Sequence, residues 1–369
     1  MLLMAWITAL STAQAADEAP VETGYDKGFY ASQGENYLIR FQGRVQPRFT
    51  FESNGDFSST QEHFEVSRAR FKMSGHVFDP RVKYYLQLDA GKGAVTLKDY
   101  FVDAYLGDSE VFVRAGQAKI WASRQQMAST ANLQMVERAI TDEHYGYGRD
   151  VGIAAYHSLG KEGGVEWVVG VYNGTGDKGV FRGETTVDLS TGEGDVEGKF
   201  SNVPAKMMPK VAATLGWAND GDVIKEADFK PDADLRFGVG GSVVAAFDHD
   251  GGDDGAVVAN LDYMLKHRGL TQTSAVYVGV AQSGGSWTSQ AYESLGFHAQ
   301  VGYTLAGKVQ PALRYAMILP SQGERTSEVG VGVNGYWHRD GWKVQADVNR
   351  QQTGAEVAYL GRTQLQLSF

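Results

Sequence analysis

Residues 39–51 read IRFQGRVQPRFTF, and this stretch decides the class of fold. Apart from Gly43, apolar side chains recur at every second position from Ile39 to Phe51, and Arg40, Gln42 and Arg44 open the polar series between them. Such a two-residue alternation is typical of a β-strand whose two faces meet different environments. The closing residues 362–369 repeat the pattern, ending on Phe369. The first and last regular segments are therefore both predicted to be two-faced strands.

The same alternation runs through the rest of the chain and predicts sixteen strands. An even number of strands, short turns that alternate with mostly longer loops, and both termini on the short-turn side are typical of outer-membrane barrels. Residues 219–234 do not fit, because they are too long for a periplasmic turn. We predict an all-β transmembrane antiparallel β-barrel, with strands near 37–52, 61–78, 82–90, 97–107, 110–119, 149–159, 164–173, 208–218, 235–247, 256–267, 270–282, 292–304, 307–318, 325–338, 341–351 and 359–369.

Composition excludes several other classes of protein. No stretch after the first sixteen residues is continuously apolar over the 18 or more positions that a membrane helix needs. The chain has no cysteine, which rules out disulfides, thiolate metal sites and cysteine nucleophiles. Its formal net charge of −10 argues against a nucleic-acid partner, whose phosphates need basic protein surface.

The N-terminus has the features of an export signal. Residues 2–10 are apolar and are followed by Ala13-Gln14-Ala15, the small-x-small pattern cut by signal peptidase. No Lys or Arg precedes the apolar core, and a buried N-terminal helix is the alternative interpretation. We expect a signal peptide at 1–15, a short periplasmic N-terminal segment at 16–36, and a barrel at 37–369.

Aromatic residues separate a membrane barrel from a soluble β-sandwich, which would also alternate. A sandwich places many aromatic residues mid-strand in its core, whereas a membrane barrel gathers them near strand ends in an interfacial girdle. The chain follows the second pattern with Tyr84, Tyr100, Trp217, Tyr263, Tyr303, Tyr315, Trp337 and Trp342.

Several motifs carry a resemblance to a known family. They are RFQGRVQ at 40–46, SRAR at 67–70, DAY at 103–105, RAGQAK at 114–119, VER at 136–138, GRDVG at 148–152 and the closing residues 362–369. At these motifs the chain resembles the phosphate-selective porin O and P family of Gram-negative outer membranes. The resemblance implies a sixteen-stranded barrel, a homotrimer, and a long third loop, here residues 121–148, folded into the pore as a constriction.

The polar strand faces would line water and are rich in Arg and Lys. A cationic wall in a narrow channel concentrates anions and excludes cations. In the first hairpin Arg44 would lie opposite or diagonal to Arg68 and Arg70, and such like-charge neighbours are destabilising unless they are used. The predicted wall residues are Arg40, Arg44, Arg48, Arg68, Arg70, Lys72, Arg114, Lys308 and Arg314. The alternative is that these cations pair with acids across the lumen and hold the barrel's shape.

Three further basic residues belong to the third loop. Lys119 occupies the position where the family's motif places a lysine, and Arg124 and Arg138 follow on the loop itself. Arg138 could equally pair with Glu137 or Asp142 and hold the loop's shape. Together with the wall residues they form the predicted anion path.

Other motifs do not point to chemistry. The pattern Gly330-x-Gly332-x-x-Gly335 resembles a dinucleotide fingerprint, but it lies in an alternating strand without a following helix. Residues 248–254 are acidic, yet Ala259 stands where a calcium-binding EF-hand needs glutamate; weak divalent binding by a surface loop remains the alternative. No catalytic set or cofactor site is predicted.

The sequence therefore predicts a porin for small anions such as phosphate and not an enzyme. Its expected partners are outer-membrane lipid, lipopolysaccharide, and the barrel assembly machinery through Phe369, with no nucleic acid. A general low-selectivity porin is the first alternative. A barrel enzyme, or a structural barrel plugged by residues 121–147 and 174–207, is a more distant one.

Overall fold

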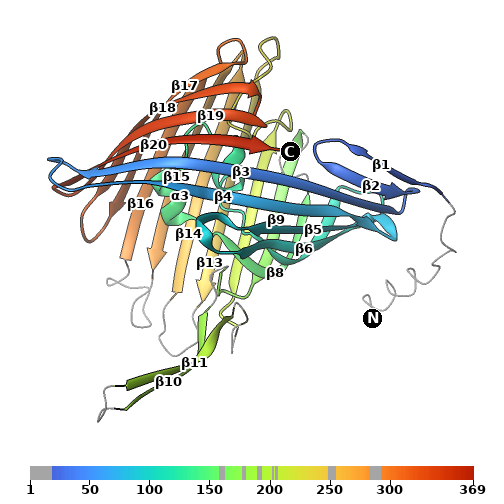
Figure 1. The fold of residues 1–369 in the computed structure, drawn as a ribbon, viewed down its shortest axis with the longest axis horizontal. Coiled ribbons are helices and arrows are strands. Elements are labelled where there is room, and N and C mark those ends of the chain that lie inside the picture. Colours follow the sequence, from blue (N-terminus) through green and yellow to red (C-terminus); the bar gives the residue numbers. More distant parts are fainter. Residues whose placement is uncertain are drawn as a thin grey trace.

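The computed structural model describes residues 19–157, 163–176, 180–188, 193–201, 203, 207–247, 255–281 and 292–369. The predicted signal peptide at 1–15 and the acidic stretch at 248–254 lie outside the described residues. Nearly all of the described chain is β-sheet, and its colours follow one another around a barrel (Figure 1).

Within the described residues, eighteen strands join in one sheet; two of them, β1 and β2, form an N-terminal hairpin, and the other sixteen form the barrel. Consecutive barrel strands pair antiparallel, and β20 pairs with β3 to close the barrel. The predicted sixteen-stranded antiparallel barrel is thus confirmed. Its strands are β3 (Tyr37–Asn54), β4 (Thr60–Val77), β5 (Asp79–Asp89), β6 (Thr96–Tyr105), β7 (Val111–Lys119), β8 (Arg149–His157), β9 (Gly164–Tyr172), β12 (Lys210–Ala218), β13 (Arg236–Phe247), β14 (Gly255–His267), β15 (Leu270–Ala281), β16 (Tyr292–Tyr303), β17 (Val309–Pro320), β18 (Thr326–His338), β19 (Trp342–Thr353) and β20 (Glu356–Ser368).

The alternation in β3 has the predicted meaning. Arg44, Gln46 and Arg48 are buried inside the barrel, while Phe41 and Val45 are exposed on its outer face. Arg44 stands directly opposite Arg70 in the register of β3 and β4, as the sequence predicts. The two faces of each strand therefore meet different surroundings, as a membrane barrel requires.

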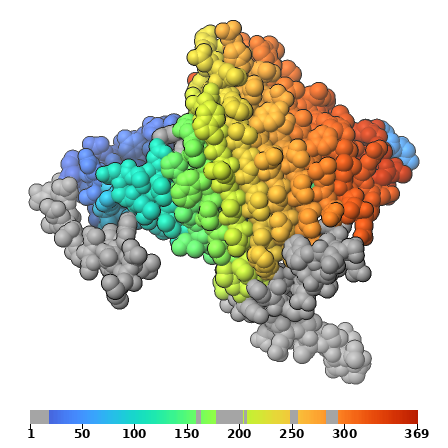
Figure 2. Space-filling model, turned by 180° about the vertical axis from the view of Figure 1, so that it is seen from behind, coloured from blue at the N-terminus to red at the C-terminus, as the bar shows by residue number. Residues whose placement is uncertain are grey.

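The outer face is an apolar belt. It exposes large aliphatic side chains along consecutive strands, which follow one another in chain order across the surface in Figure 2. Trp217, Trp337 and Trp342 are exposed at the strand ends on the side of the two termini, and the rings of Trp337 and Trp342 stack 5.9 Å apart. Indole rings at this level are typical of a membrane–water interface.

Two hairpins lie outside the barrel wall. β1 (Val21–Tyr25) pairs with β2 (Phe29–Gln33). β2 in turn pairs with the first residues of β3, in the part of that strand that β20 does not reach. β10 (Val180–Asp188) and β11 (Glu193–Ser201) form a separate two-stranded sheet that projects away from the barrel (Figure 1). The second segment considered as a plug, 174–207, thus places its described strands away from the lumen.

Short helices complete the described structure: η1 (Gly91–Gly93), α2 (Arg124–Met127), η2 (Thr130–Asn132) and α3 (Ile140–Tyr145). None of the helices in the described part of the chain has the length and apolar character needed to cross a bilayer. α2, η2 and α3 all belong to the connection between β7 and β8.

Candidate functional site

The connection between β7 and β8, residues 120–148, contacts inward-facing side chains on many sides of the barrel; we call it loop 3. Arg44 Nη1 on β3 donates to Ser129 Oγ at 3.0 Å, and Asn334 Nδ2 on β18 donates to Gln134 O at 2.8 Å. On a third side, the Arg124 backbone N–H donates to Asp262 Oδ2 on β14 at 3.2 Å. Loop 3 is therefore held within the lumen by polar contacts to distant strands.

Inward-facing glycines make room for loop 3. A Cβ atom added at Gly302 would lie 2.6 Å from the Gln134 side chain, and one at Gly332 would lie 2.9 Å from Met135 Sδ. Such separations are below any ordinary van der Waals contact, so a larger residue would have to displace the loop. Gly330 and Gly332 of the glycine pattern in β18 thus serve packing against the loop, whereas Gly335 lies on the outer face beside Trp337.

Glu137 is the main acidic anchor of loop 3. Its carboxylate accepts hydrogen bonds from Arg68 Nη2 at 2.7 and 2.9 Å and from Arg48 Nη2 at 2.5 Å. Arg314 Nη1 also donates to the Glu137 carbonyl oxygen at 2.8 Å. Burial alone would raise the pKa of Glu137, but the guanidinium groups of Arg68 and Arg48 lower it to about 2. The anchor is thus ionised at neutral pH.

A second loop enters the lumen between β12 and β13, and it is the long connection that did not fit a periplasmic turn. Glu226 on this loop is buried, and its carboxylate accepts from Gln125 Nε2 at 2.9 Å, the Gln134 backbone N–H at 2.7 Å and Gln300 Nε2 at 2.8 Å. Its own N–H donates to Asn132 O at 3.0 Å. The length of this connection is therefore used to hold loop 3.

Loop 3 leaves open space against the wall formed by β4 to β8. This space, the basic cavity, has a volume of about 220 Å³. Its polar lining includes Asp99, the one acid among the described lining residues, and six basic residues, namely Arg70, Lys72, Arg114, Lys119, Arg138 and Arg149. Positive charge is therefore concentrated beside loop 3.

Three of the six lining cations have acidic partners at short range. Arg70 Nε lies 2.8 Å from Asp89, and Arg114 and Arg149 bind Asp103 and Asp99 through two hydrogen bonds each. These pairs follow the alternative interpretation, in which lumen charges hold the barrel's shape.

The other three are less compensated. Lys119 Nζ donates to three carbonyl oxygens of loop 3, at Gln126, Met127 and Ala128, and it forms no direct ion pair with a carboxylate of the described residues. Arg138 likewise donates to loop carbonyls, with Asp142 at 3.7 Å. Lys72 has no hydrogen-bond or ion-pair partner within the described ranges.

The remaining predicted residues lie outside the basic cavity. Arg44 adjoins it, and its side-chain partners in the described part of the chain are the hydroxyls of Ser129 and Thr130. Arg40 pairs with Asp26 of the N-terminal hairpin at 3.2 Å and stands opposite Ser74 in the register of β3 and β4. The others are Arg48 and Arg68, bound to Glu137; Arg124, enclosed with Glu166 and Asp262; Arg314, paired with Glu328; and Lys308, exposed near the strand ends.

Sequence reasoning gave too little weight to several residues of this region. Arg149 lines the basic cavity, and its place in the GRDVG motif beside loop 3 is a usable signal in the sequence. Tyr85 and Phe101 line the basic cavity and carry no charge that would have drawn attention to them. Glu226 had no local signal at all, because its partners are far away in the sequence.

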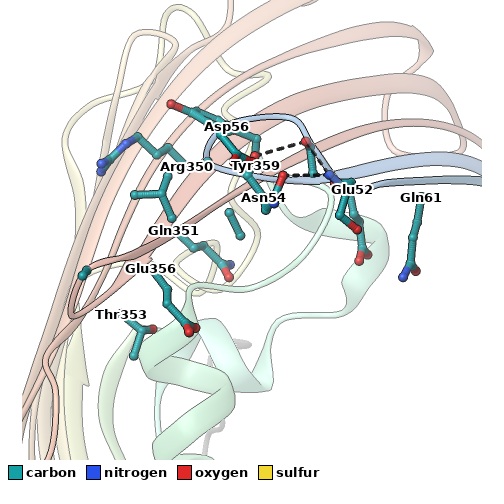
Figure 3. Close-up of a pocket in the computed structure, with 15 residues that line it drawn as sticks. Glu52, Asn54, Asp56, Gln61, Arg350, Gln351, Thr353, Glu356 and Tyr359 are labelled. Carbon is teal, nitrogen blue, oxygen red and sulfur yellow. Dashed lines mark hydrogen bonds between the residues drawn. The ribbon is translucent and has the colours of Figure 1, made fainter.

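The mouth on the opposite side from the two termini is acidic. Glu52, Asp56 and Glu356 line a hollow of about 840 Å³ at the ends of β3, β19 and β20, with Arg350 on its rim (Figure 3). The carboxylates in Figure 3 point into open space and not toward a common centre. Charges here are exposed, and screening limits their field to about 8 Å at physiological salt.

Residues 39–199 match the sequence profile of the family described as "Phosphate-selective porin O and P". Over this part of the chain, which is less than half of its 369 residues, the protein is similar to this porin family. The match covers β3 to β9 and most of β10 and β11, and it includes all of loop 3 and the wall around the basic cavity. Among curated proteins, none matches this chain.

Solved structures agree with the porin fold. An anion-selective porin from Comamonas acidovorans superposes with a TM-score of 0.61 at 9% identity, covering 90% of this chain and 99% of that one. A loop-deletion mutant of OmpT, an outer membrane protein of Vibrio cholerae, gives 0.60 at 11%, covering 90% and 99%. The outer membrane channel DcaP of Acinetobacter baumannii gives 0.58 at 11%, covering 92% and 99%. At such identities the likeness concerns the fold alone; fold and family together support an outer-membrane channel.

Proposed function

We propose that this porin lets small anions, such as phosphate or related oxyanions, diffuse across the Gram-negative outer membrane along the β4–β8 side of its lumen. The observation that carries the proposal is the basic cavity beside loop 3, which is lined by six cations, three of them in ion pairs with Asp89, Asp99 and Asp103. A narrow passage with low-dielectric walls focuses such a field and raises the local anion concentration. Loop 3 would act as the constriction.

The arrangement suits conduction better than tight binding. A channel must bind an ion well enough to admit it and weakly enough to release it, which favours several moderate sites. Arg70, Arg114 and Arg149 each pair with a carboxylate, whereas Lys72 and Lys119 have no carboxylate partner among the described residues. An oxyanion could therefore pass from one guanidinium or ammonium group to the next, with Arg44 adjoining the path.

The acidic mouth favours a second candidate, a general porin of low selectivity. Glu52, Asp56 and Glu356 would oppose the approach of anions and could cancel the preference of the wall. The filling of the lumen by loop 3 and the Glu226 loop likewise makes a plugged barrel a testable outcome. We infer a channel and not a barrel enzyme, because the polar side chains of the lumen hydrogen-bond to the two inserted loops or line the basic cavity.

Reversal potential in a potassium chloride gradient across a planar bilayer tests the proposal. The wild-type channel should pass chloride more readily than potassium. Lys72→Glu should reduce the chloride-to-potassium permeability ratio about three- to tenfold, since a two-unit charge change acts on ions passing within several ångströms in water. Lys308→Glu is the matched control, because Lys308 is exposed outside the basic cavity.

Two outcomes would count against the proposal. A wild-type channel that prefers potassium would favour the low-selectivity porin with an acidic mouth, and absence of any conductance would favour the plugged barrel. Equal effects of Lys72→Glu and Lys308→Glu on the chloride-to-potassium permeability ratio would show that anions do not pass through the basic cavity.

We also propose the assembly that the sequence predicts: removal of a signal peptide at 1–15, a periplasmic segment at 16–36, a homotrimer in contact with outer-membrane lipid and lipopolysaccharide, and recognition of Phe369 by the barrel assembly machinery. A trimer form of OmpT of Vibrio cholerae is among the solved structures with this fold. Phe369 exchanges backbone hydrogen bonds with Gly43 at 2.7 and 3.0 Å, which places it at the closure between β20 and β3.

A further inference from the structure

One side of the basic cavity is aromatic. Tyr85 on β5 and Phe101 on β6 are register partners, and their rings stack with centroids 5.2 Å apart and planes 10° from parallel. Both line the cavity, together with Met127 and Ala118. Inorganic oxyanions are hydrated on all sides and gain nothing from such a wall, so its presence beside the cations calls for a ligand with an apolar part.

The ring stack already accepts a flat group. The Arg114 guanidinium carbon lies 3.6 Å from the Phe101 ring centroid, while the same guanidinium holds Asp103 through two hydrogen bonds. A planar, delocalised group thus packs on the aromatic column while its polar edge is satisfied elsewhere. A second planar ring can extend the column over Tyr85 or meet its edges, which are the preferred arrangements of aromatic pairs.

Next to this column lies Lys72, a cation with no hydrogen-bond or ion-pair partner among the residues that the structure describes. Lys72 pairs in register with Gln87, and Tyr85 pairs with Ser74, so Lys72 and Tyr85 occupy neighbouring inward positions of β4 and β5. Lys72 and Tyr85 both line the cavity. A carboxylate attached to a ring beside Tyr85 would therefore find the Lys72 ammonium group within the same space.

The volume is sufficient for such a ligand. A cavity of 150 Å³ in another protein admits benzene, and the basic cavity has about 220 Å³. The additional space accommodates one carboxylate.

We propose that the basic cavity takes planar aromatic carboxylates, with the ring against Tyr85 and Phe101 and the carboxylate toward Lys72, in preference to non-planar or inorganic anions of similar charge. This inference rests on the proposed anion path and specifies the class of anion that the path favours. Ring contact supplies the preference, and the basic residues supply the charge selection.

Block of chloride current in planar bilayers tests the preference with the intact channel. Benzoate, cyclohexanecarboxylate and inorganic phosphate are added in turn; the first two have the same charge and similar size, but only benzoate is planar. Benzoate should halve the current at a concentration about three- to tenfold below that of cyclohexanecarboxylate, the range expected for one aromatic contact. Equal half-blocking concentrations in the wild type would overturn the inference.

A pair of matched variants locates the contact. Phe101→Leu keeps an apolar side chain but removes the ring from the cavity, and it should abolish the advantage of benzoate over cyclohexanecarboxylate. Phe112→Leu is the control: Phe112 also lies inside the barrel and near the Arg114 guanidinium, at 5.6 Å, but outside the cavity. Loss of the benzoate advantage in both variants, or in neither, would overturn the placement.

The two levels of the argument fail separately. A wild-type channel selective for potassium would overturn the proposed anion path and this inference with it. A chloride-selective channel that benzoate and cyclohexanecarboxylate block equally would overturn only the aromatic preference and leave the anion path standing.

Discussion

Replacing Glu137 with Gln should loosen loop 3 from the wall of β3 and β4 without unfolding the barrel. The substitution keeps the shape of the side chain but removes the charge that Arg48 and Arg68 share. A carboxyl pKa lowered from 4.5 to about 2 corresponds to an interaction of about 3 kcal/mol with these guanidinium groups. The Glu137 side chain is 18% exposed, and therefore we expect the loss in loop docking to be about 1–3 kcal/mol.

The pH dependence of the wild type follows from the same anchor. Because the folded pKa of Glu137 is depressed, its contribution is complete above the ordinary carboxyl pKa and is lost as pH falls from about 4.5 toward about 2. Single-channel current of the wild type should be steady above pH 5 and become noisier below pH 4. The Glu137→Gln channel should be noisy already at pH 7 and lack that acid step.

Glu143→Gln provides the matched control for this experiment. Glu143 lies on the same loop and the substitution changes the charge equally, but its side chain is exposed and forms no ion pair within the described ranges. Both variants should raise anion preference slightly, since each removes one negative charge. If the Glu137→Gln and Glu143→Gln channels show the same current noise and the same pH profile, the anchoring role of Glu137 is refuted. Its effect on the channel would then come from its charge alone.

Two further changes test how loop 3 is held. Gly302→Val should push Gln134 aside and change the single-channel conductance. The control is Ala299→Val, three residues away on the exposed outer face of β16, which should leave the conductance unchanged. Unchanged conductance in both variants would contradict the packing role of the inward glycines. Glu226→Ala removes the carboxylate that accepts from three buried donors, so it should raise both the conductance and the current noise. Lys225→Ala, at the exposed neighbouring residue, is the control. Unchanged conductance and noise in Glu226→Ala would contradict the role of the second loop in holding loop 3.

The barrel itself was accessible from the sequence because strand alternation is a local property. The first strand, predicted at 37–52, runs from 37 to 54, and the last, predicted at 359–369, runs from 356 to 368. Inward and outward faces were also correct across β3 and β4, even though a bulge shifts the register between Gln46 and Pro47. Each lipid-facing position requires an apolar residue, so the pattern is written along the chain.

The interior could not be predicted in the same way, because its contacts join positions far apart in the sequence. Glu226 meets Gln125 and Gln300 across separations of 101 and 74 residues, and glutamine carries no signal of such a role. Glycine is abundant in the sequence, but nothing local distinguishes Gly302, which leaves room for the Gln134 side chain, from a glycine in a turn. These partners become visible only once the barrel brings them together.

Lys119 shows how the interior changes the interpretation of a basic residue. The family's motif suggested a lysine on the path, and a lumen side chain in open water could change charge at little structural cost. In the structure Lys119 Nζ donates to the carbonyl oxygens of Gln126, Met127 and Ala128, so it shapes loop 3 as well as lining the basic cavity. A glutamate there would face three acceptors with no donor of its own, and it would move the loop along with the charge. Replacing Lys72 separates the change in charge from a movement of the loop. Lys72 is half-buried and has no partner in the described ranges, so its replacement alters the field in the basic cavity and leaves the hydrogen bonds of loop 3 intact.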